Sequence, residues 1–282
     1  MAALFLRFPG GKAKALTFSY DDGVEQDLQL VQIFKKYGMR ATFNLNGGQF
    51  AQEGHVYPEG QVHRRMSESQ IKNAYPEDVC EVACHAYKHP FLTAFSNPAP
   101  ICYQIIEDRK ALESLFRRRI QGMAYPFGPT NDMAVDALKA CGIYYARTTV
   151  STEKFDMPTD WLRLPATCHH KNPRLMELAD RFLEMKAPHH PQMFYVWGHS
   201  YEFADDNNWD VIERFAEKMG GREDVWYATN DELFNYVDAF RKMVFTADMK
   251  LAHNPTLVPL FFAFRRELYT LAPGETIQLP NK

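Results

Sequence analysis

Short apolar runs alternate along most of the chain with longer stretches whose apolar residues recur at helical spacing. Each run is bounded by glycine, proline or polar residues and is too short for a buried helix, so we interpret the runs as β-strands. The predicted strands lie at 15–20, 40–46, 79–84, 122–126, 143–149, 193–198 and 225–228.

The stretches between these runs predict amphipathic helices. At 25–37, Leu28, Val31 and Phe34 form one apolar stripe, and Gly38 is a suitable C-terminal cap. A capping-box pattern at 67–70 predicts a short helix. Further helices are expected at 100–118, 131–141, 173–186, 208–219 and 230–243.

Strict alternation of strand and helix predicts an α/β fold with parallel strands and helices outside them. An open doubly wound sheet is the competing architecture, but seven units with reactive residues on several strands favour a (β/α)7 barrel over residues 1–243. The remaining residues, 244–282, predict a small β-rich C-terminal extension. Its expected strands are 245–248, 257–264, 267–271 and 276–279.

Composition and charge limit the expected partners and the expected location of the protein. The 282 residues carry a net charge of −3, with 24% charged residues, so neither a nucleic acid nor an acidic membrane is an expected partner. No segment has the length of a membrane span. The start, Met1–Arg7, lacks a basic n-region and a cleavage site, and the five cysteines are scattered, so we expect a cytoplasmic protein without a disulfide framework.

Four of the predicted strands end on residues able to do chemistry. These ends carry Asp21-Asp22, His85 with His89, Pro126-Phe127-Gly128, and His199. The carboxyl ends of parallel strands meet at one rim, where such groups can act together.

The residue types at this rim are those of a metal-dependent hydrolase. Pro90 directly follows His89 and makes a continuous helix there unfavourable, so both histidines are expected to lie in a loop. From this loop His85 and His89 are expected to bind a metal together with one of the two adjacent carboxylates. The other carboxylate can then act as general base and His199 as general acid. A backbone amide of the 126–128 turn can stabilise an anionic intermediate.

The chain resembles the polysaccharide deacetylase family, the NodB-homology group known as carbohydrate esterase family 4. The resemblance spans roughly residues 12–242, in the family's order, and rests on four motifs: Ser19-Tyr-Asp-Asp-Gly23, His85-x-x-x-His89, Tyr125-Pro-Phe-Gly128 and Trp197-Gly-His199. It implies a distorted (β/α)7 barrel.

The same resemblance implies a role for each site residue. Asp21 resembles the catalytic base, and Asp22, His85 and His89 resemble the metal ligands. His199 resembles the catalytic acid, and the amide of Phe127 would contribute to the oxyanion site. The implied cofactor is a divalent metal, usually Zn²⁺, with Co²⁺, Ni²⁺ or Mn²⁺ as alternatives.

The chain departs from the family pattern at two motifs. Ala124 stands where the third motif usually has an arginine that orients the base, so we expect Arg147 or Arg163 to replace it, ordinary ion pairs being the alternative. The segment Asp156-Met-Pro-Thr-Asp160-Trp161 resembles the fourth motif with one extra residue. Either aspartate is therefore expected to partner His199.

Aromatic residues near the strand ends leave two interpretations open. Tyr125, Trp161, Trp197 and Tyr201 are candidates for stacking on a sugar ring, and packing is the alternative. His169 is expected to face substrate or to lie in an ordinary loop. A second metal site at Cys168-His169-His170 is disfavoured because no carboxylate adjoins it.

These observations predict a metal-dependent hydrolase that removes acetyl groups from N-acetylated sugars or glycans. An O-acetyl esterase, a cyclic amide hydrolase of the allantoinase type and a catalytically impaired carbohydrate-binding barrel are the alternatives. The expected partner is a carbohydrate or a small N-acetylated compound. The sequence predicts neither the exact substrate nor the oligomeric state.

Overall fold

A parallel sheet lies at the centre of the computed structural model, which describes residues 4–186 and 189–280. Its strands follow the order β7-β6-β5-β4-β3-β2-β9-β8, and β10 pairs with the first part of β2. The strands are β2 (Lys14–Asp21), β3 (Ala41–Leu45), β4 (Cys80–Cys84), β5 (Gly122–Ala124), β6 (Tyr145–Ser151), β7 (Leu164–Ala166), β8 (Cys168–His169), β9 (Gln192–Gly198) and β10 (Val225–Tyr227).

The two ends of this sheet meet at one interrupted strand. β7 pairs with β6, and β8 pairs with β9 on the other side. Only Thr167 separates β7 from β8, and its amide donates to the carbonyl of Tyr195 at 2.8 Å. The strand order therefore returns on itself, as in a distorted seven-stranded barrel, and the predicted α/β class is confirmed.

The seventh member of this ring is not the strand that the sequence predicts. The prediction counts 225–228, yet β10 lies beside β2 and the ring is completed by residues 164–169. That segment, Leu164-Pro-Ala-Thr-Cys-His169, contains a proline and gives each neighbour only two or three residues. Such a short, divided strand has no alternating pattern that a sequence reading could detect.

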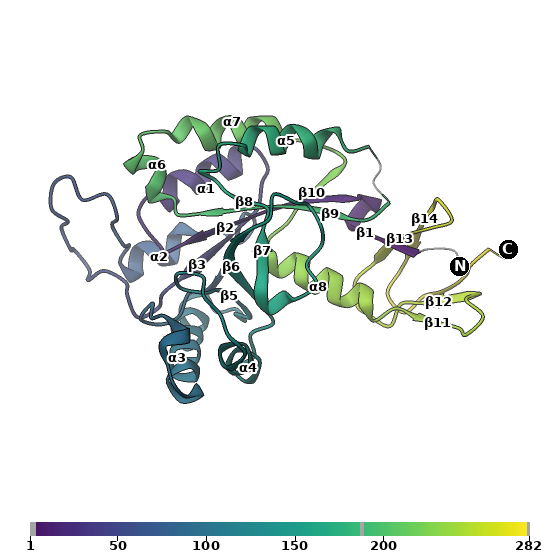
Figure 1. Cartoon of the computed structure of the whole chain (residues 1–282), viewed down its shortest axis with the longest axis horizontal. Coiled ribbons are helices and arrows are strands. Elements are labelled where there is room, and N and C mark those ends of the chain that lie inside the picture. The colour runs from purple at the N-terminus through teal and green to yellow at the C-terminus, as the bar shows by residue number, and fades with distance from the viewer. Residues whose placement is uncertain (1–3, 187–188, 281–282) are drawn as a thin grey trace.

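Helices surround the sheet on its outer side (Figure 1). Their ends follow local capping: the Thr229 hydroxyl accepts from the amide of Glu232, whose carboxylate accepts from the amide of Thr229 at 2.9 Å. The short α6, which begins two residues after His199, is a helix that the sequence does not predict. The helices are α1 (Asp27–Lys36), α2 (Glu68–Ala74), α3 (Pro98–Phe116), α4 (Asp132–Ala140), α5 (Leu175–Glu184), α6 (Tyr201–Asp205), α7 (Trp209–Met219) and α8 (Asn230–Arg241).

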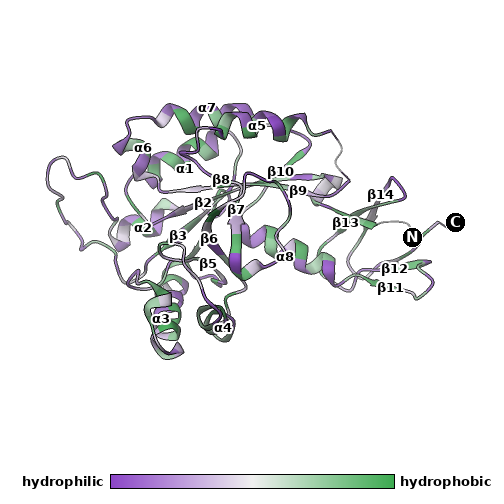
Figure 2. Cartoon of the chain, in the orientation of Figure 1, coloured by the Kyte–Doolittle hydropathy of each residue, from purple (hydrophilic) through white to green (hydrophobic). Residues whose placement is uncertain are grey.

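Apolar side chains fill the space between sheet and helices, and the green of Figure 2 runs through the central strands. All eight residues of β2 are buried, among them Phe18 and Tyr20, which pack against Phe34 of α1. Lys14, Thr17, Ser19 and Asp21 of this strand are polar and nonetheless buried. Among the described residues, no helix has the length and apolar character needed to cross a membrane.

The C-terminal extension lies at one end of the molecule, away from α2 (Figure 1). It contains the antiparallel sheet β11-β12-β15 and a second sheet in which β1, from the start of the chain, pairs with β13. The boundary at residue 243 remains a prediction, and the pairing of β1 was not expected. The strands are β1 (Leu4–Arg7), β11 (Val244–Phe245), β12 (Leu251–His253), β13 (Leu260–Phe264), β14 (Glu267–Leu271) and β15 (Thr276–Gln278).

Candidate active site

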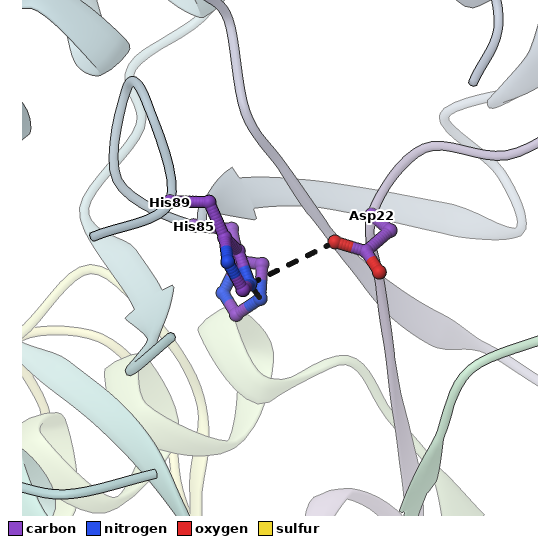
Figure 3. A group of neighbouring side chains, drawn as sticks. All are labelled: Asp22, His85 and His89. Carbon is purple, nitrogen blue, oxygen red and sulfur yellow. Dashed lines mark hydrogen bonds and ion pairs between the residues drawn. The ribbon is translucent and has the colours of Figure 1, made fainter. Parts of the chain in front are cut away.

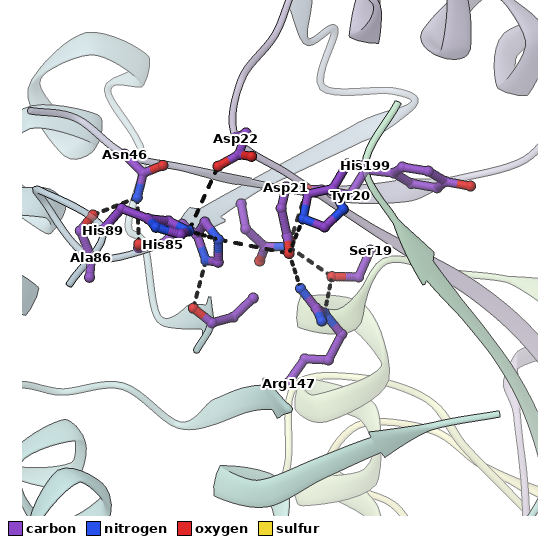
Figure 4. Close-up of polar contacts among 12 residues, drawn as sticks. Ser19, Tyr20, Asp21, Asp22, Asn46, His85, Ala86, His89, Arg147 and His199 are labelled. Carbon is purple, nitrogen blue, oxygen red and sulfur yellow. Dashed lines mark hydrogen bonds and ion pairs between the residues drawn. The ribbon is translucent and has the colours of Figure 1, made fainter. Parts of the chain in front are cut away.

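The reactive residues that follow β2, β4 and β9 lie together at one rim of the barrel (Figure 4). Asp21 ends β2 and Asp22 follows it, while His85 comes directly after β4. The side chain of Asp21 occupies the centre. Its Oδ2 lies 3.8 Å from Nε2 of His85 and 3.9 Å from Nε2 of His199.

Asp22, His85 and His89 form a group with the composition of a metal site (Figure 3). The Nε2 atoms of the two histidines are 3.1 Å apart, and Nε2 of His89 lies 3.9 Å from Oδ1 of Asp22. All three ligand atoms lie within 4.8 Å of one another. Two imidazoles and one carboxylate are the donors of many catalytic zinc sites.

His85 and His89 are in the neutral protonation state that binding of a cation requires. Nδ1 of His85 lies 2.8 Å from the carbonyl oxygen of Ala124, which only accepts, so Nδ1 carries the proton and Nε2 presents a lone pair. Burial lowers the pKa of His85. Burial and the neighbouring His85 lower the pKa of His89 to about 4. Both imidazoles are therefore neutral at pH 7, the form that binds metal.

Arg147 provides the contact that the third motif lacks. Its fully buried guanidinium donates to Oδ2 of Asp21 and, at 3.1 Å, to Oγ of Ser19, with the Trp197 ring 4.5 Å away. Asn44 donates to Oδ1 of Asp21 at 2.8 Å. Burial alone would raise the pKa of Asp21, but Arg147 and the nearby histidines lower it below its usual range. Asp21 is thus a carboxylate at neutral pH.

Arg163, the other arginine considered, has no contact with Asp21. It bonds Asp160 at 3.0 Å and Asp132 at 2.5 Å, and about a third of its side chain is exposed. Of the two alternatives, the structure brings only Arg147 to Asp21.

The partner of His199 is Glu202 and neither expected aspartate. Oε2 of Glu202 lies 3.3 Å from Nδ1 of His199 and accepts from its backbone amide at 3.0 Å. Burial opposes a charge on His199, but the hydrogen bond to Glu202 and the negative charges of Asp21 and Asp22 together outweigh it and raise the pKa of the imidazole. Asp160 instead accepts from the amide of Leu162 at 2.9 Å, and the exposed Asp156 pairs through its backbone with Gln192. The extra residue in the fourth motif fits this displacement.

Most of the aromatic candidates are packing residues. The hydroxyl of Tyr125 donates to the carbonyl of Leu162 at 2.8 Å, and the side chain is buried. Trp161 packs edge-on against Phe234 at 5.4 Å. Trp197 is covered by Arg147 and by His169, whose ring lies 4.5 Å away. None of these three presents an open face to a sugar, since each is less than a tenth exposed.

Phe127 has the surroundings expected for a rim residue. Half of its side chain is exposed, and it stacks on Phe91 with ring centroids 3.9 Å apart. Its backbone has a φ of 63°, in the left-handed region that a bulky residue rarely adopts. Asp22, Ala86 and His89 share this conformation, with φ values of 88°, 61° and 53°. Strained backbone of this kind clusters at functional sites.

His169 and His170 lie against Glu202, so the carboxylate that the sequence lacked comes from α6. Nε2 of His169 is 3.2 Å from Oε2 of Glu202, but its Nδ1 accepts from the amide of Lys171 at 3.1 Å. In neutral His169 the proton is therefore on Nε2, which lies beside Glu202 and has no lone pair for a metal. Glu202 thus lies among His169, His170 and His199, and within the described residues neither ring nitrogen of the buried His170 has a hydrogen-bond partner.

Several site residues were not predicted from the sequence. His63 and Arg65 contact Asp22 from the segment between β3 and α2. Asp108 of α3 accepts from the backbone amide of His85 at 2.9 Å. The only signal for Glu202 was its position three residues after His199, and the others carried none, because the fold alone brings them to the rim.

Comparison with known proteins agrees with this geometry. Residues 9–146 match the family model described as polysaccharide deacetylase. Over these residues the chain is similar to the polysaccharide deacetylase family. The segment matched to this deacetylase family contains Asp21, Asp22, His85, His89 and Phe127 and ends directly before Arg147. A search of curated protein sequences gives no match.

Solved structures of deacetylases share the fold. A Mycobacterium smegmatis protein assigned to the polysaccharide deacetylases aligns with 86% of this chain and 96% of its own, at 15% identity and a TM-score of 0.57. The chitin deacetylase of Colletotrichum lindemuthianum aligns over 78% and 87%, at 20% identity and 0.52. A Streptomyces lividans family 4 carbohydrate esterase, solved with acetate, aligns over 77% and 93%, at 17% and 0.51.

Proposed function

We propose that the chain is a metal-dependent hydrolase that removes the acetyl group from an N-acetylated sugar or glycan. The observation that carries this proposal is the position of Asp21. Its Oδ2 lies within 4 Å of both Nε2 of His85, in the ligand group, and Nε2 of His199. A candidate base, a candidate metal-binding group and a candidate acid thus lie together at the rim, where they could act on one acetyl group.

Asp21 and His199 have the protonation states that hydrolysis needs. Arg147 helps to keep Asp21 ionised, so the carboxylate can take a proton from the attacking water. Glu202 favours the imidazolium form of His199, which can give a proton to the leaving amine. Two titratable groups pushed in opposite directions by their surroundings are typical of an acid–base pair.

Asp22, His85 and His89 would hold the metal, with Zn²⁺ the best match to their donor atoms and Co²⁺, Ni²⁺ or Mn²⁺ as substitutes. When bound, such an ion polarises the acetyl carbonyl and lowers the pKa of water. The amide of Phe127, in the turn that follows β5, would donate to the developing oxyanion. Its side chain, with Phe91, would border the substrate.

The substrate class follows from the family and from the Streptomyces lividans enzyme, whose structure contains acetate. An O-acetyl ester needs the same groups, so it is a second outcome of the assay below. The impaired-barrel alternative rested on Ala124, and the contact between Arg147 and Asp21 removes that reason. No contact in the described residues favours a cyclic amide.

The test is acetate release from N-acetylglucosamine oligomers and from acetylated xylan, with metal content measured on the same samples. We expect chelation to abolish release, Zn²⁺ to restore it, and His89→Ala to lose metal and activity together. Asp21→Asn should lose activity and keep metal. His55→Ala, which removes an exposed histidine outside the ligand group, is the matched control. Full activity in metal-free protein would contradict the proposal.

A further inference from the structure

The segment between β3 and α2 runs beside the ligand group. Arg65 pairs with Val24 in an antiparallel bridge, and the amide of Met66 donates to the carbonyl of Gly23 at 3.0 Å. The backbone of Arg65 is thereby fixed next to the residues that follow Asp22. Its side chain is only 16% exposed and points back to the rim.

The guanidinium of Arg65 joins two parts of the chain. Nη2 donates to Oδ1 of Asp22 at 2.8 Å, and Nη1 donates to the Asp22 carbonyl at 2.7 Å and to Oδ1 of Asn46 at 2.8 Å. Asn46 is fully buried, and its amide nitrogen donates to the carbonyls of His85 and Ala86 (Figure 4). One continuous set of hydrogen bonds therefore runs from the carboxylate of Asp22 to the loop that carries both histidines.

We propose that Arg65 is a positioning residue that holds Asp22 and the His85–His89 loop at the spacing a divalent cation requires. The inference rests on the proposed metal site. Asp22 and His89 both have left-handed backbones, so neither conformation is the one that its residue type prefers. The planar guanidinium of Arg65 donates to acceptors on two segments, Asp22 and Asn46, and can therefore fix both segments. The single ammonium group of a lysine cannot do so.

A second effect of Arg65 opposes this one. A positive guanidinium beside Asp22 repels a bound cation, so loss of the charge alone would strengthen metal binding. The two effects separate in two variants. Arg65→Lys keeps the charge and loses the fork, and Arg65→Gln loses both. If positioning dominates, both variants bind metal more weakly than the wild type, and Arg65→Lys binds most weakly.

The experiment measures Zn²⁺ affinity of the metal-stripped full chain by competition with a chromophoric chelator. We expect a loss of about 10- to 100-fold in both variants, the range typical of residues that orient metal ligands. The absorption spectrum of bound Co²⁺ should change as well, which a purely structural role would not require. Urea unfolding of the metal-free proteins confirms that each variant folds.

Arg64→Gln is the matched control. Arg64 is adjacent on the same segment and bonds Glu25 at 2.5 Å and the Gln61 carbonyl at 3.0 Å, away from Asp22. Its Zn²⁺ affinity should equal that of the wild type. Wild-type affinity in either Arg65 variant, or tighter binding in Arg65→Gln, overturns the positioning role alone. A wild-type chain that binds no Zn²⁺ overturns the metal site and this role together.

Discussion

Ala124 and Arg147 are Cα partners in the parallel pair of β5 and β6. From this position Arg147 extends across the barrel interior to Oδ2 of Asp21 (Figure 4). The arginine absent from the third motif is thus replaced from the neighbouring strand at the same level of the sheet. An arginine at position 124 would compete with Arg147 for the buried carboxylate of Asp21, and alanine at that position avoids this competition.

Arg147→Ala should lower kcat/KM for acetate release by 10²-fold or more, since it removes the buried donor on the base. The pKa of Asp21 would rise without the guanidinium, so the acidic limb of the pH–rate profile should move to higher pH. Zn²⁺ content should not change. Arg163→Ala, which breaks only the pairs with Asp160 and Asp132, is the control and should keep the wild-type profile. An unshifted acidic limb in Arg147→Ala would refute this role.

Glu202→Gln should move the alkaline limb to lower pH. His199 must be protonated to act as an acid, and Glu202 raises its pKa, so loss of the carboxylate lets the proton leave at lower pH. NMR titration of the His199 ring checks the same shift without a substrate. Asp156→Asn and Asp160→Asn serve as controls and should leave both readouts unchanged. A shift in Asp160→Asn but not in Glu202→Gln would restore the fourth-motif assignment.

The fold and the centre of the site were predictable because their signals are local. Apolar runs located the strands, and the groups at their ends required only that parallel strands share a rim. The parts that were missed depend on tertiary contacts. Residues 164–169 are too short and interrupted to show a strand pattern, and Arg65 comes from a polar segment without periodicity. Glu202, and neither aspartate of the fourth motif, contacts His199 because α6 brings it there.

Asp108→Asn should destabilise the protein by about 1–3 kcal/mol. The two oxygens of Asp108 accept from the amides of Gly47, at 2.6 Å, and His85, at 2.9 Å. Asparagine would turn an N–H group toward one of these donors. Urea unfolding measures the loss. Glu107→Gln, on the same helix, changes a side chain that pairs with Lys110 at 2.7 Å and should change stability by less than about 0.5 kcal/mol.

Asp27 should make stability depend on pH. Burial raises its pKa to about 7, although it accepts from Tyr75 at 2.6 Å and Ser200 at 2.5 Å. Between pH 4 and 7 the folded state then keeps a proton that the unfolded state has lost, so the contribution of Asp27 to stability falls as the pH rises.

The variant Asp27→Asn removes this titration. The free energy of unfolding of the wild type, relative to the variant, should decrease by about 3 kcal/mol from pH 4 to 7 and then level off. Urea unfolding at several pH values provides the measurement. Asp136→Asn, at a position whose side chain is 73% exposed, should show a constant difference. A constant difference for Asp27→Asn would mean that the carboxyl is already ionised at pH 4.

The residues with left-handed backbones at the rim lower the stability of the folded state but carry polar and aromatic side chains. Glycine would adopt these angles at Asp22, His89 and Phe127 without strain, but it has no carboxylate, imidazole or ring. Each position therefore holds a side chain at a conformational penalty of about 1–2 kcal/mol that the rest of the barrel must offset. Glycine substitutions selected only for thermal resistance would accumulate at residues of the proposed active site. Gains in robustness that leave the chemistry intact must come from the barrel wall and its helices.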